Sequence, residues 1–387
     1  MKIGIVCYAT VGGSGVVATE LAHALASRGH DIHLISADLP FRWRWGAHGL
    51  SFERVEAPTY PIFREPQYLL ALTNTLVRVS RRHGLDLIHA HYAVPHATAA
   101  YLAHRILSAE TGRPPKTVTT LHGTDITLVG SDPSYASVVG FSIESSHGVT
   151  AVSESLKRDT IASLGVKRDI EVIPNFLDCQ EYDRRPDAEL RSRLCPTGDC
   201  EAIVTHVSNF RAVKRTEIVL EIFRCIREQV NARLLMVGDG PQRPAVERQA
   251  AETGLGDVVH FVGEQHDVVS WLSVADLFLL PSGQESFGLA ALEAMSCQVP
   301  VIASRVGGLP EVITHGVTGF TFDPQDVAGM AACGVALLKD PARRQAVGDA
   351  AARDVRRRFC ETVVVPRYER YYEDVVAGRT DVHSSGA

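Results

Sequence analysis

A strand–loop–helix pattern that recurs along the whole chain most constrains what it can fold into. Short apolar runs, typical of buried parallel strands, are each followed by a polar or glycine-rich turn and then a helical pattern. These runs lie at residues 3–7, 32–35, 86–92, 117–125 and 149–153, and again at 202–207, 234–237, 258–262, 277–280 and 299–303. Such alternation predicts two α/β domains in tandem, each a Rossmann-like parallel sheet.

The length supports the same division, because 387 residues exceed what one core usually organises. We place an N-terminal domain at residues 1–170 and a C-terminal domain at 171–365. A polar stretch from residue 173 to Asp199 is expected to be a linker between the two patterns. A final helix is predicted at 366–380, followed by a flexible tail at 381–387.

Composition excludes several classes of protein. A net charge of -6 and a pI near 6.2 argue against nucleic-acid binding, which usually needs a basic excess. The chain has no 18-residue apolar run and no leader pattern, so we expect a cytoplasmic protein without stable membrane association. The eight cysteines are scattered, which favours buried thiols over a zinc site or a disulfide framework. The sequence leaves open whether the chain is a monomer or a homo-oligomer.

Two glutamates eight residues apart, Glu285 and Glu293, follow the apolar run at 277–280 and flank the predicted start of a helix. We expect Ser286 and Gly288 to lie in the first turn of that helix. The free N–H groups of a helix N-terminus attract phosphate, and a carboxylate on each side can bind hydroxyl groups. A nucleotide sugar has this order of groups. The alternative is an amphipathic helix with one solvated glutamate.

A glycine-rich turn follows the first predicted strand. Its backbone N–H groups and the Ser14 hydroxyl could hold an anion at the start of the next helix, although a tight turn without a ligand is the alternative. Gly13-x-Gly15-x-x-Ala18, with Asp38 after the second strand, also fits a dinucleotide fingerprint and would indicate an NAD-dependent oxidoreductase. That match is weakened because Gly13 comes six positions after Cys7, whereas the fingerprint glycine normally follows its strand at once.

Polar groups at the carboxyl ends of the other strands are further candidates, since ligands of parallel α/β sheets bind at that edge. In the first domain these groups are Tyr92, Thr120, His122 and Asp125. Ser153 could meet a ligand or cap a helix. His89, His91 and His96 have no carboxylate at metal-ligand spacing, which favours ordinary strand-end histidines over a metal site.

In the second domain, Arg211 and Lys214 open a helix after a strand, where fixed cations can neutralise a departing diphosphate. A solvated basic turn is the alternative reading of the same residues. The loops at residues 238–241 and 263–265 could let the backbone approach a base.

Taken together, these motifs resemble the retaining glycosyltransferases of family 4, which have the two-domain GT-B fold. The resemblance extends to about Gly378 and rests on residues 11–15, 88–92, 119–127, 206–211, 213–215 and 285–293. Within the family it is strongest to the enzymes that transfer N-acetylglucosamine from UDP-N-acetylglucosamine to the hydroxyl of L-malate, the first step of bacillithiol biosynthesis. It also implies that the final helix packs back on the N-terminal domain.

The resemblance implies a role for each matching residue. Donor binding is assigned to Gly13, Arg211, Lys214, Gly263, Gln265, Glu285, Ser286, Phe287, Gly288, Leu289 and Glu293. Acceptor binding is assigned to Gly13, Ser14, Tyr92, Thr120, Asn209 and Arg211. Catalytic roles fall to His122, Glu285, Arg211 and Lys214. In this scheme Glu293 binds the ribose, Glu285 binds a sugar hydroxyl, and His122 lies against the sugar.

We expect no cofactor and no metal, because the chain lacks the D-x-D motif that usually binds a metal–diphosphate and has Arg211 and Lys214 instead. Other acceptors remain alternatives, namely an inositol phosphate or a lipid or glycan sugar. Such acceptors would call for an added phosphate-binding cation or a basic amphipathic face. Arg42 and Arg44 are the only residues found in the sequence that could contribute to either feature. A nucleotide-sugar-binding protein without turnover is a further alternative.

Overall fold

The chain forms two compact units. The computed structural model describes residues 1–9, 13–58, 67–126, 130, 132–196 and 200–380. Unit 1 comprises Met1–Asn175 together with the segment from Thr362 onward, and unit 2 comprises Phe176–Glu361. These boundaries lie a few residues from those predicted at 170 and 365, because residues 171–172 pair with the first sheet. No helix in the described part of the chain is long and apolar enough to cross a membrane.

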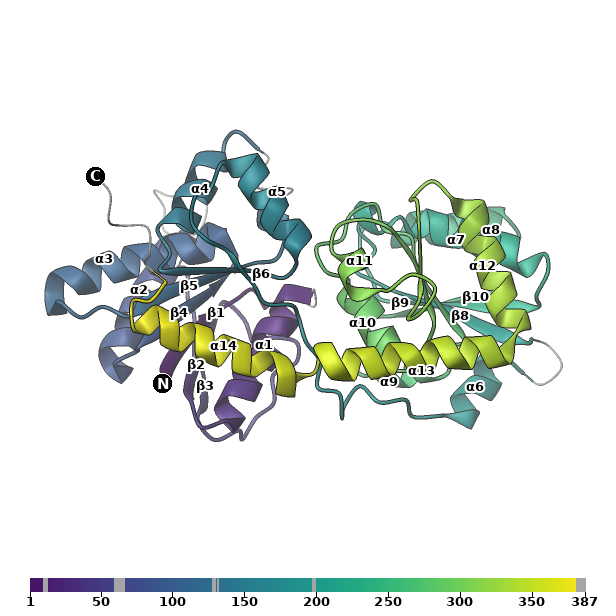
Figure 1. Cartoon of the computed structure of the whole chain (residues 1–387), viewed down its shortest axis with the longest axis horizontal. Helices are drawn as coiled ribbons and strands as arrows, with labels where there is room; N and C mark the ends of the chain where they lie inside the picture. Colours follow the sequence, from purple (N-terminus) through teal and green to yellow (C-terminus); the bar gives the residue numbers. More distant parts are fainter. Residues whose placement is uncertain (10–12, 59–66, 127–129, 131, 197–199, 381–387) are drawn as a thin grey trace. The chain divides into compact units, whose positions relative to one another are not determined.

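Unit 1 is built on a seven-stranded parallel sheet with the strand order β3-β2-β1-β4-β5-β6-β7 (Figure 1). Its strands are β1 (Lys2–Val6), β2 (Asp31–Ser36), β3 (Leu50–Arg54), β4 (Leu87–His91), β5 (Lys116–Leu121), β6 (Gly148–Ala151) and β7 (Glu171–Val172). Every residue of β4 is buried, as expected for a central strand covered on both faces. All pairings in this sheet are parallel, so the carboxyl ends of its strands meet along one edge.

The helices of unit 1 are α1 (Gly13–Ser27), α2 (Tyr68–His83), α3 (Thr98–Thr111), α4 (Ala136–Glu144), α5 (Glu154–Leu164) and α14 (Glu361–Val376). A short irregular turn, η1 (Ala93–Ala97), contains a cis Val94–Pro95 bond. Helix α14, yellow in Figure 1, lies against the sheet: the Tyr371 hydroxyl bonds to the backbone of Val149, and Tyr372 bonds to His89. A Cβ at Gly148 would come within 2.6 Å of Val375, so a glycine is needed for this close approach.

Unit 2 has a six-stranded parallel sheet with the order β10-β9-β8-β11-β12-β13. Its strands are β8 (Ala202–Val207), β9 (Ala232–Val237), β10 (Val259–Gly263), β11 (Leu277–Leu280), β12 (Val301–Ser304) and β13 (Phe320–Phe322). Its helices are α6 (Ala188–Leu194), α7 (Thr216–Arg227), α8 (Arg243–Glu252), α9 (Val268–Ser273), α10 (Leu289–Ser296), α11 (Leu309–Val312), α12 (Val327–Lys339) and α13 (Pro341–Arg358), with a 3₁₀ turn η3 (Ala212–Lys214). The two sheets confirm the predicted architecture of two parallel α/β domains.

Helix α6 corrects the expectation of a linker up to Asp199. The Asp187 carboxylate accepts a hydrogen bond from the Leu190 backbone N–H and caps the helix. Leu190 and Leu194 then pack in a small apolar cluster with residues of β8 and β9. The helix is hard to recognise in the sequence because it buries only one narrow face, and its other positions are polar and exposed to water.

Two cysteine pairs also differ from the expectation of unpaired thiols. Cys179 and Cys360 form a disulfide with Cα atoms 5.5 Å apart, and Cys195 and Cys200 form another with a separation of 5.3 Å. The first pair spans 181 residues, a distance at which sequence spacing carries no information about pairing. Both disulfides lie in unit 2.

Candidate active site

In unit 2, the predicted site residues gather where the β8–α7 loop meets the β11–α10 loop. The Lys214 Nζ donates a hydrogen bond to Glu285 Oε1 at 2.5 Å, and the Ser282 hydroxyl donates to the same oxygen at 3.1 Å. The Gly283 N–H donates to the Val213 carbonyl at 2.8 Å, which joins the two loops through their backbones. The structure therefore brings Lys214 and Glu285 together in a half-buried ion pair with side-chain exposures of 22% and 9%.

A pair of glycines after β12 supports the loop that carries Glu285. The Gly308 N–H donates to the Glu285 carbonyl at 3.0 Å. A Cβ at Gly307, whose φ is +51°, would lie only 1.8 Å from that same oxygen. The glycines thus let two backbones touch and set the direction of the loop. Sequence reasoning missed this support, although a Gly-Gly pair a few residues after a predicted strand was an available signal.

Helix α10 begins at Leu289, later than expected. Gly288 is its N-cap and has a left-handed φ of 96°, so Ser286 and Phe287 lie outside the helix. Phe287 is buried with its ring edge-on to Phe359 at 5.7 Å, which anchors the turn. Because the first turn of α10 contains no acidic residue, its N–H groups keep their attraction for an anion.

Glu293 lies in α10 and is only 6% exposed. The Tyr182 hydroxyl donates a hydrogen bond to its Oε1 at 3.0 Å. Tyr182 is itself 3% exposed and lies 111 residues earlier in the chain, in the stretch expected to be a linker. The sequence could not reveal this partner of Glu293, because nothing local connects Tyr182 to the glutamate.

The loop after β8 carries Asn209 and Arg211. Arg211 is exposed, while Asn209 Oδ1 is shielded from solvent and has no hydrogen-bond partner among the described residues. A Cβ at Gly240 would lie 2.0 Å from the Asn209 carbonyl, so this loop is also held against a glycine turn. Beneath it, His206 bonds to Ser208 Oγ at 2.8 Å, and burial lowers the pKa of His206 to about 4.

Gln265 stabilises its own loop through both side-chain atoms. Its Nε2 donates to the Val262 carbonyl at 2.7 Å, and its Oε1 accepts from the Trp271 indole at 3.1 Å. Gly263 has a φ of 71° and its carbonyl accepts the Gly238 N–H at 2.8 Å. Since the Gln265 amide is engaged, contact of this loop with a base would have to come from the backbone, and that contact stays a prediction.

In unit 1, the Ser14 and Tyr92 hydroxyls lie 2.7 Å apart. Gly13 opens α1 directly before Ser14, and the first turn of that helix has no acidic residue. Tyr92 follows β4 with a left-handed φ of 89°, and its ring lies 5.3 Å from that of His122 and 5.6 Å from that of Tyr8. Tyr8, two residues after β1, is an exposed neighbour that sequence reasoning did not select.

His122 is partly buried and is held by a second histidine. Its Nε2 lies 2.8 Å from Nδ1 of His91, and the two rings stack at 5.0 Å. Burial is the main cause that lowers the pKa of His122 to about 3 and the pKa of His91 well below its usual range, so both rings are neutral near pH 7. Asp125 was expected to face a ligand, but it is only 2% exposed. Its carboxylate accepts hydrogen bonds from the backbone N–H groups of Gly123 and Ala93.

Thr120 is not brought together with the Ser14–Tyr92 pair through its side chain. It is fully buried, and its hydroxyl lies 2.6 Å from both His89 Nε2 and Thr150 Oγ1. Its backbone carbonyl accepts the Tyr92 N–H at 3.0 Å, so Thr120 can act on the site by positioning Tyr92. The Ser153 hydroxyl accepts a hydrogen bond from the Leu156 N–H and caps α5. Of the two predicted roles for Ser153, ligand contact or helix cap, the structure shows the cap.

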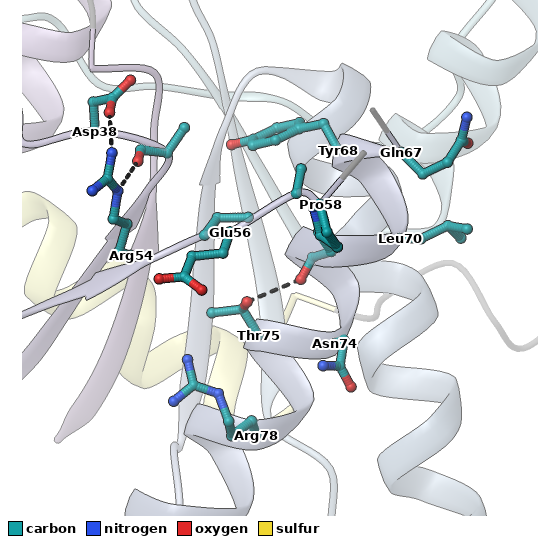
Figure 2. Close-up of a pocket in the computed structure, with 14 residues that line it drawn as sticks. Asp38, Arg54, Glu56, Pro58, Gln67, Tyr68, Leu70, Asn74, Thr75 and Arg78 are labelled. Carbon is teal, nitrogen blue, oxygen red and sulfur yellow. Dashed lines mark hydrogen bonds and ion pairs between the residues drawn. The ribbon is translucent and has the colours of Figure 1, made fainter. Parts of the chain in front are cut away.

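A separate open pocket of about 1270 Å³ lies in unit 1 between the ends of β2 and β3 and helix α2 (Figure 2). Its walls include Asp38, which pairs with Arg54 at 2.9 Å, and the side chains of Tyr68 and Asn74. None of the residues assigned to donor binding, acceptor binding or catalysis lines it. The carboxylate expected for the dinucleotide alternative is therefore already paired with a cation.

Comparison with known proteins defines the family. Residues 11–181 match the family model described as Glycosyltransferase Family 4, and residues 197–354 match the model described as Glycosyl transferases group 1. The chain is 44% identical over 376 residues to N-acetyl-alpha-D-glucosaminyl L-malate synthase of Bacillus anthracis, covering 97% of each chain. The chain belongs to glycosyltransferase family 4. A more distant relative of this glycosyltransferase is D-inositol 3-phosphate glycosyltransferase of Frankia alni, 28% identical over 85% of this chain and 86% of the relative.

Solved structures agree on the fold. Sucrose-phosphate synthase from Thermosynechococcus elongatus superposes with a TM-score of 0.80 at 23% identity, covering 97% of this chain and 99% of that one. Anabaena HepE, solved in complex with UDP-glucose, superposes with a TM-score of 0.78 at 21% identity, covering 97% and 100%. These similarities confirm the GT-B fold. Family membership also removes the oxidoreductase alternative for this glycosyltransferase.

Replacing Tyr182 by phenylalanine is expected to raise the KM for the nucleotide-sugar donor about 10-fold with little change in kcat. The substitution removes a hydrogen bond to a buried carboxylate, an interaction of about 1.5–3 kcal/mol, and loosens Glu293 in ground and transition states alike. Steady-state kinetics with varied donor measure the effect, and the KM for the acceptor serves as the internal control. An unchanged donor KM would mean that Glu293 does not contact the donor.

The histidine cluster of this glycosyltransferase predicts acid lability of unit 1. Burial lowers the pKa of His89 to about 3 and that of His96 to about 4, and His91 and His122 shift the same way. The unfolded chain takes up these protons near pH 6.5 and the folded unit does not, so stability present above pH 6.5 is lost as pH falls toward 4. Asp125, whose pKa is raised to about 6, opposes this in part by taking up one proton when folded.

The net loss in the free energy of unfolding is on the order of 5 kcal/mol between pH 6.5 and pH 5. Hydrogen–deuterium exchange of peptides from β4 and β5 at the two pH values measures it, after correction for intrinsic exchange. Peptides from β8 and β9 are the comparison, because His206 is the only fully buried histidine among the described residues of unit 2. Equal loss of protection in both units would contradict the prediction.

Proposed function

We propose that this glycosyltransferase transfers N-acetylglucosamine from UDP-N-acetylglucosamine to the hydroxyl of L-malate with retention of the α configuration. The observation that carries the proposal is 44% identity over 97% of both chains to a protein named for this reaction. Both substrates are small and water-soluble, which agrees with a cytoplasmic enzyme. The product then enters bacillithiol biosynthesis.

The donor site would occupy the carboxyl edge of the unit 2 sheet. Lys214 and Arg211 supply cations for the diphosphate, and the N–H groups at the start of α10 add hydrogen bonds. Glu293 would bind the ribose hydroxyls and Glu285 a hydroxyl of the sugar. In support, both carboxylates are already oriented by partners, Glu293 by Tyr182 and Glu285 by Lys214 and Ser282.

The acceptor site would occupy the N-terminus of α1. Malate carries two carboxylates, and the helix N-terminus, the Ser14 hydroxyl and the Tyr92 hydroxyl are the donors that suit them. The geometry of unit 1 supports a positioning role for Thr120 rather than direct contact. The roles assigned to Gly13 and His122 toward the donor, and to Asn209 and Arg211 toward the acceptor, stay predictions from the resemblance.

We infer a front-face reaction in which the leaving group assists the acceptor. The bond between the anomeric carbon and the β-phosphate oxygen breaks, and a bond forms from the same face to the malate oxygen. The hydroxyl proton of malate passes to the departing phosphate oxygen, so no external base is needed. Lys214 and Arg211 stabilise the charge that develops on the diphosphate.

Metal independence is part of the proposal. Lys214 and Arg211 would neutralise the diphosphate, which is the role of a divalent ion in glycosyltransferases that use a metal. The test is UDP release by the purified protein in EDTA, with and without L-malate, and mass spectrometry of the product. Malate-dependent release of UDP and a product of one N-acetylhexosamine plus malate would support donor, acceptor and metal independence together. Turnover that is lost in EDTA and restored by Mg²⁺ would overturn metal independence alone. Release only with another acceptor, such as an inositol phosphate, would overturn the acceptor assignment.

A further inference from the structure

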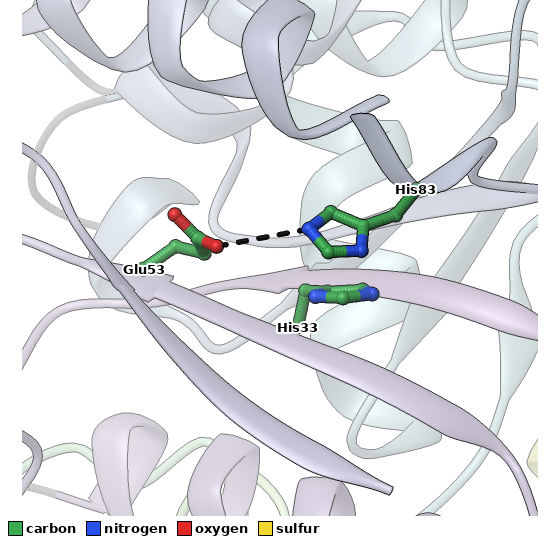
Figure 3. Close-up of side chains that lie close together, drawn as sticks. All are labelled: His33, Glu53 and His83. Atoms are coloured by element: carbon green, nitrogen blue, oxygen red, sulfur yellow. Dashed lines mark ion pairs between the residues drawn. The ribbon is translucent and has the colours of Figure 1, made fainter. Parts of the chain in front are cut away.

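A histidine–carboxylate cluster lies in unit 1 apart from every residue assigned to the reaction. It contains His33 in the middle of β2, Glu53 in β3 and His83 at the end of α2 (Figure 3). One ligand atom of each residue lies within 4.8 Å of the others. Since β2 and β3 are paired with His33 beside Ser51, the side chains of His33 and Glu53 point to the same face of the sheet, where α2 packs.

The nitrogen atoms that face this cluster lack hydrogen bonds. His33 is only 2% exposed, and its Nδ1 is satisfied by Ser51 Oγ at 2.7 Å, while its Nε2 has no hydrogen-bond partner. The same is true of Nε2 of His83, which lies 3.9 Å from Glu53 Oε1. A buried polar atom without a hydrogen-bond partner is costly, and one bound ion would satisfy both of these nitrogens.

We propose that His33, Glu53 and His83 bind a divalent transition-metal ion, with zinc as the ion of matching chemistry. Two imidazoles and one carboxylate are a ligand set that zinc accepts. Ligand atoms around a tetrahedral zinc lie about 3.3 Å apart. The three ligand atoms here lie within 4.8 Å of one another, so the groups need to close by at most about 1.5 Å. Asp31 Oδ1, 3.6 Å from His33 Nε2, can supply a fourth ligand or hold a bound water.

The surrounding charges allow the ion to bind. Glu53 offers Oε1 to the cluster, while its Oε2 faces Arg78 at 3.5 Å, so the guanidinium does not occupy the ligand position. His33 has its unpartnered Nε2 available to the cluster. Ser51 bonds to the other ring nitrogen and orients it, as partners of metal-bound histidines do.

The inferred role is structural. The ion would tie the carboxyl end of α2 to β2 and to the edge strand β3, which has only one neighbour in the sheet. Binding to the folded state alone raises stability by mass action. Turnover of the donor should not require the ion, because none of its ligands belongs to the assigned donor or acceptor residues.

The test uses the full-length protein, freed of metal by EDTA and of any affinity tag, and titrated with Zn²⁺ by calorimetry. We expect one ion per chain with a Kd of 1 μM or tighter, and a Tm that rises by about 4 °C or more at 100 times the Kd. His83→Gln and Glu53→Gln should each weaken binding at least about 10-fold and abolish most of the Tm shift.

His104→Gln is the matched control. His104 also faces another histidine, His147, with ring centres 4.7 Å apart, but both Nδ1 atoms there are engaged by backbone groups. This variant should bind Zn²⁺ as the parent protein does. Equal binding by His83→Gln and Glu53→Gln would overturn the proposal, as would the absence of binding at 10 μM Zn²⁺. Substitution with Co²⁺ distinguishes histidine ligands from cysteine ligands. A thiolate-to-cobalt absorption band would show that the ion binds a cysteine, and this result would also overturn the proposal.

Discussion

Replacing Lys214 by methionine is expected to lower kcat/KM for UDP-N-acetylglucosamine by about 10²- to 10³-fold, mainly through kcat. The lysine is held 2.5 Å from Glu285. In the proposed reaction it neutralises the negative charge that the departing diphosphate gains. Without the ammonium, that charge loses a fixed counter-ion. The half-buried carboxylate of Glu285 also becomes unpaired and repels the diphosphate.

Steady-state kinetics and single-turnover measurements separate the loss of chemistry from the loss of donor binding. Lys339→Met is the matched control, because Lys339 is an exposed lysine at the end of α12 in the same unit and should leave both constants unchanged. A Lys214 variant that raises only KM would contradict a role in the transition state. It would indicate that the cation binds donor and transition state equally.

Much of this site could be predicted from the sequence, because chemistry-bearing residues of parallel sheets follow the ends of apolar strands. Lys214 and Glu285 were both found this way, and the structure brings them into contact. Ser14 and Tyr92 were placed at the ends of two predicted strand segments and lie 2.7 Å apart. The local sequence pattern therefore identified those side chains whose contact partners also follow the ends of strands.

The prediction failed where the two faces of a strand carry similar residues. Thr119 and Thr120 are adjacent and fully buried, so their side chains point to opposite faces of a covered sheet. Without a polar face to mark the outside, the sequence could not show that the hydroxyl of Thr120 joins His89 inside. Strand β3 was missed for a related reason, since its residues are half-buried at an edge and lack a strong apolar run.

Contacts between distant segments were the second failure. Tyr182 was assigned to a linker and is instead a buried partner of Glu293. The support of the Glu285 loop by Gly307 depends on two backbones meeting. The Gly-Gly pair signals a close approach but not which segment it meets. Both contacts fix the position of a predicted site residue. The rate of an enzyme depends strongly on such positions, because small displacements of reacting groups slow the reaction.

Replacing Gly307 by alanine should therefore reduce kcat/KM by about 100-fold or more. The new Cβ would lie 1.8 Å from the Glu285 carbonyl oxygen, and the contacting atom is backbone, so the loop has to move by more than 1 Å. A displacement of that size at a positioning residue costs about 10²-fold in rate. Overpacking should also lower the free energy of unfolding by about 1–3 kcal/mol.

Gly316→Ala isolates the geometric effect, because Gly316 also has a positive φ, +79°, but nothing lies within 4 Å of its added Cβ. It should incur only the strain of a left-handed alanine, about 1 kcal/mol of stability, and keep the activity of the parent protein. Kinetics and urea unfolding of the two variants in parallel make the comparison. If Gly307→Ala loses stability but retains activity, the contact supports the fold without directing Glu285, and the loop tolerates displacement during the reaction.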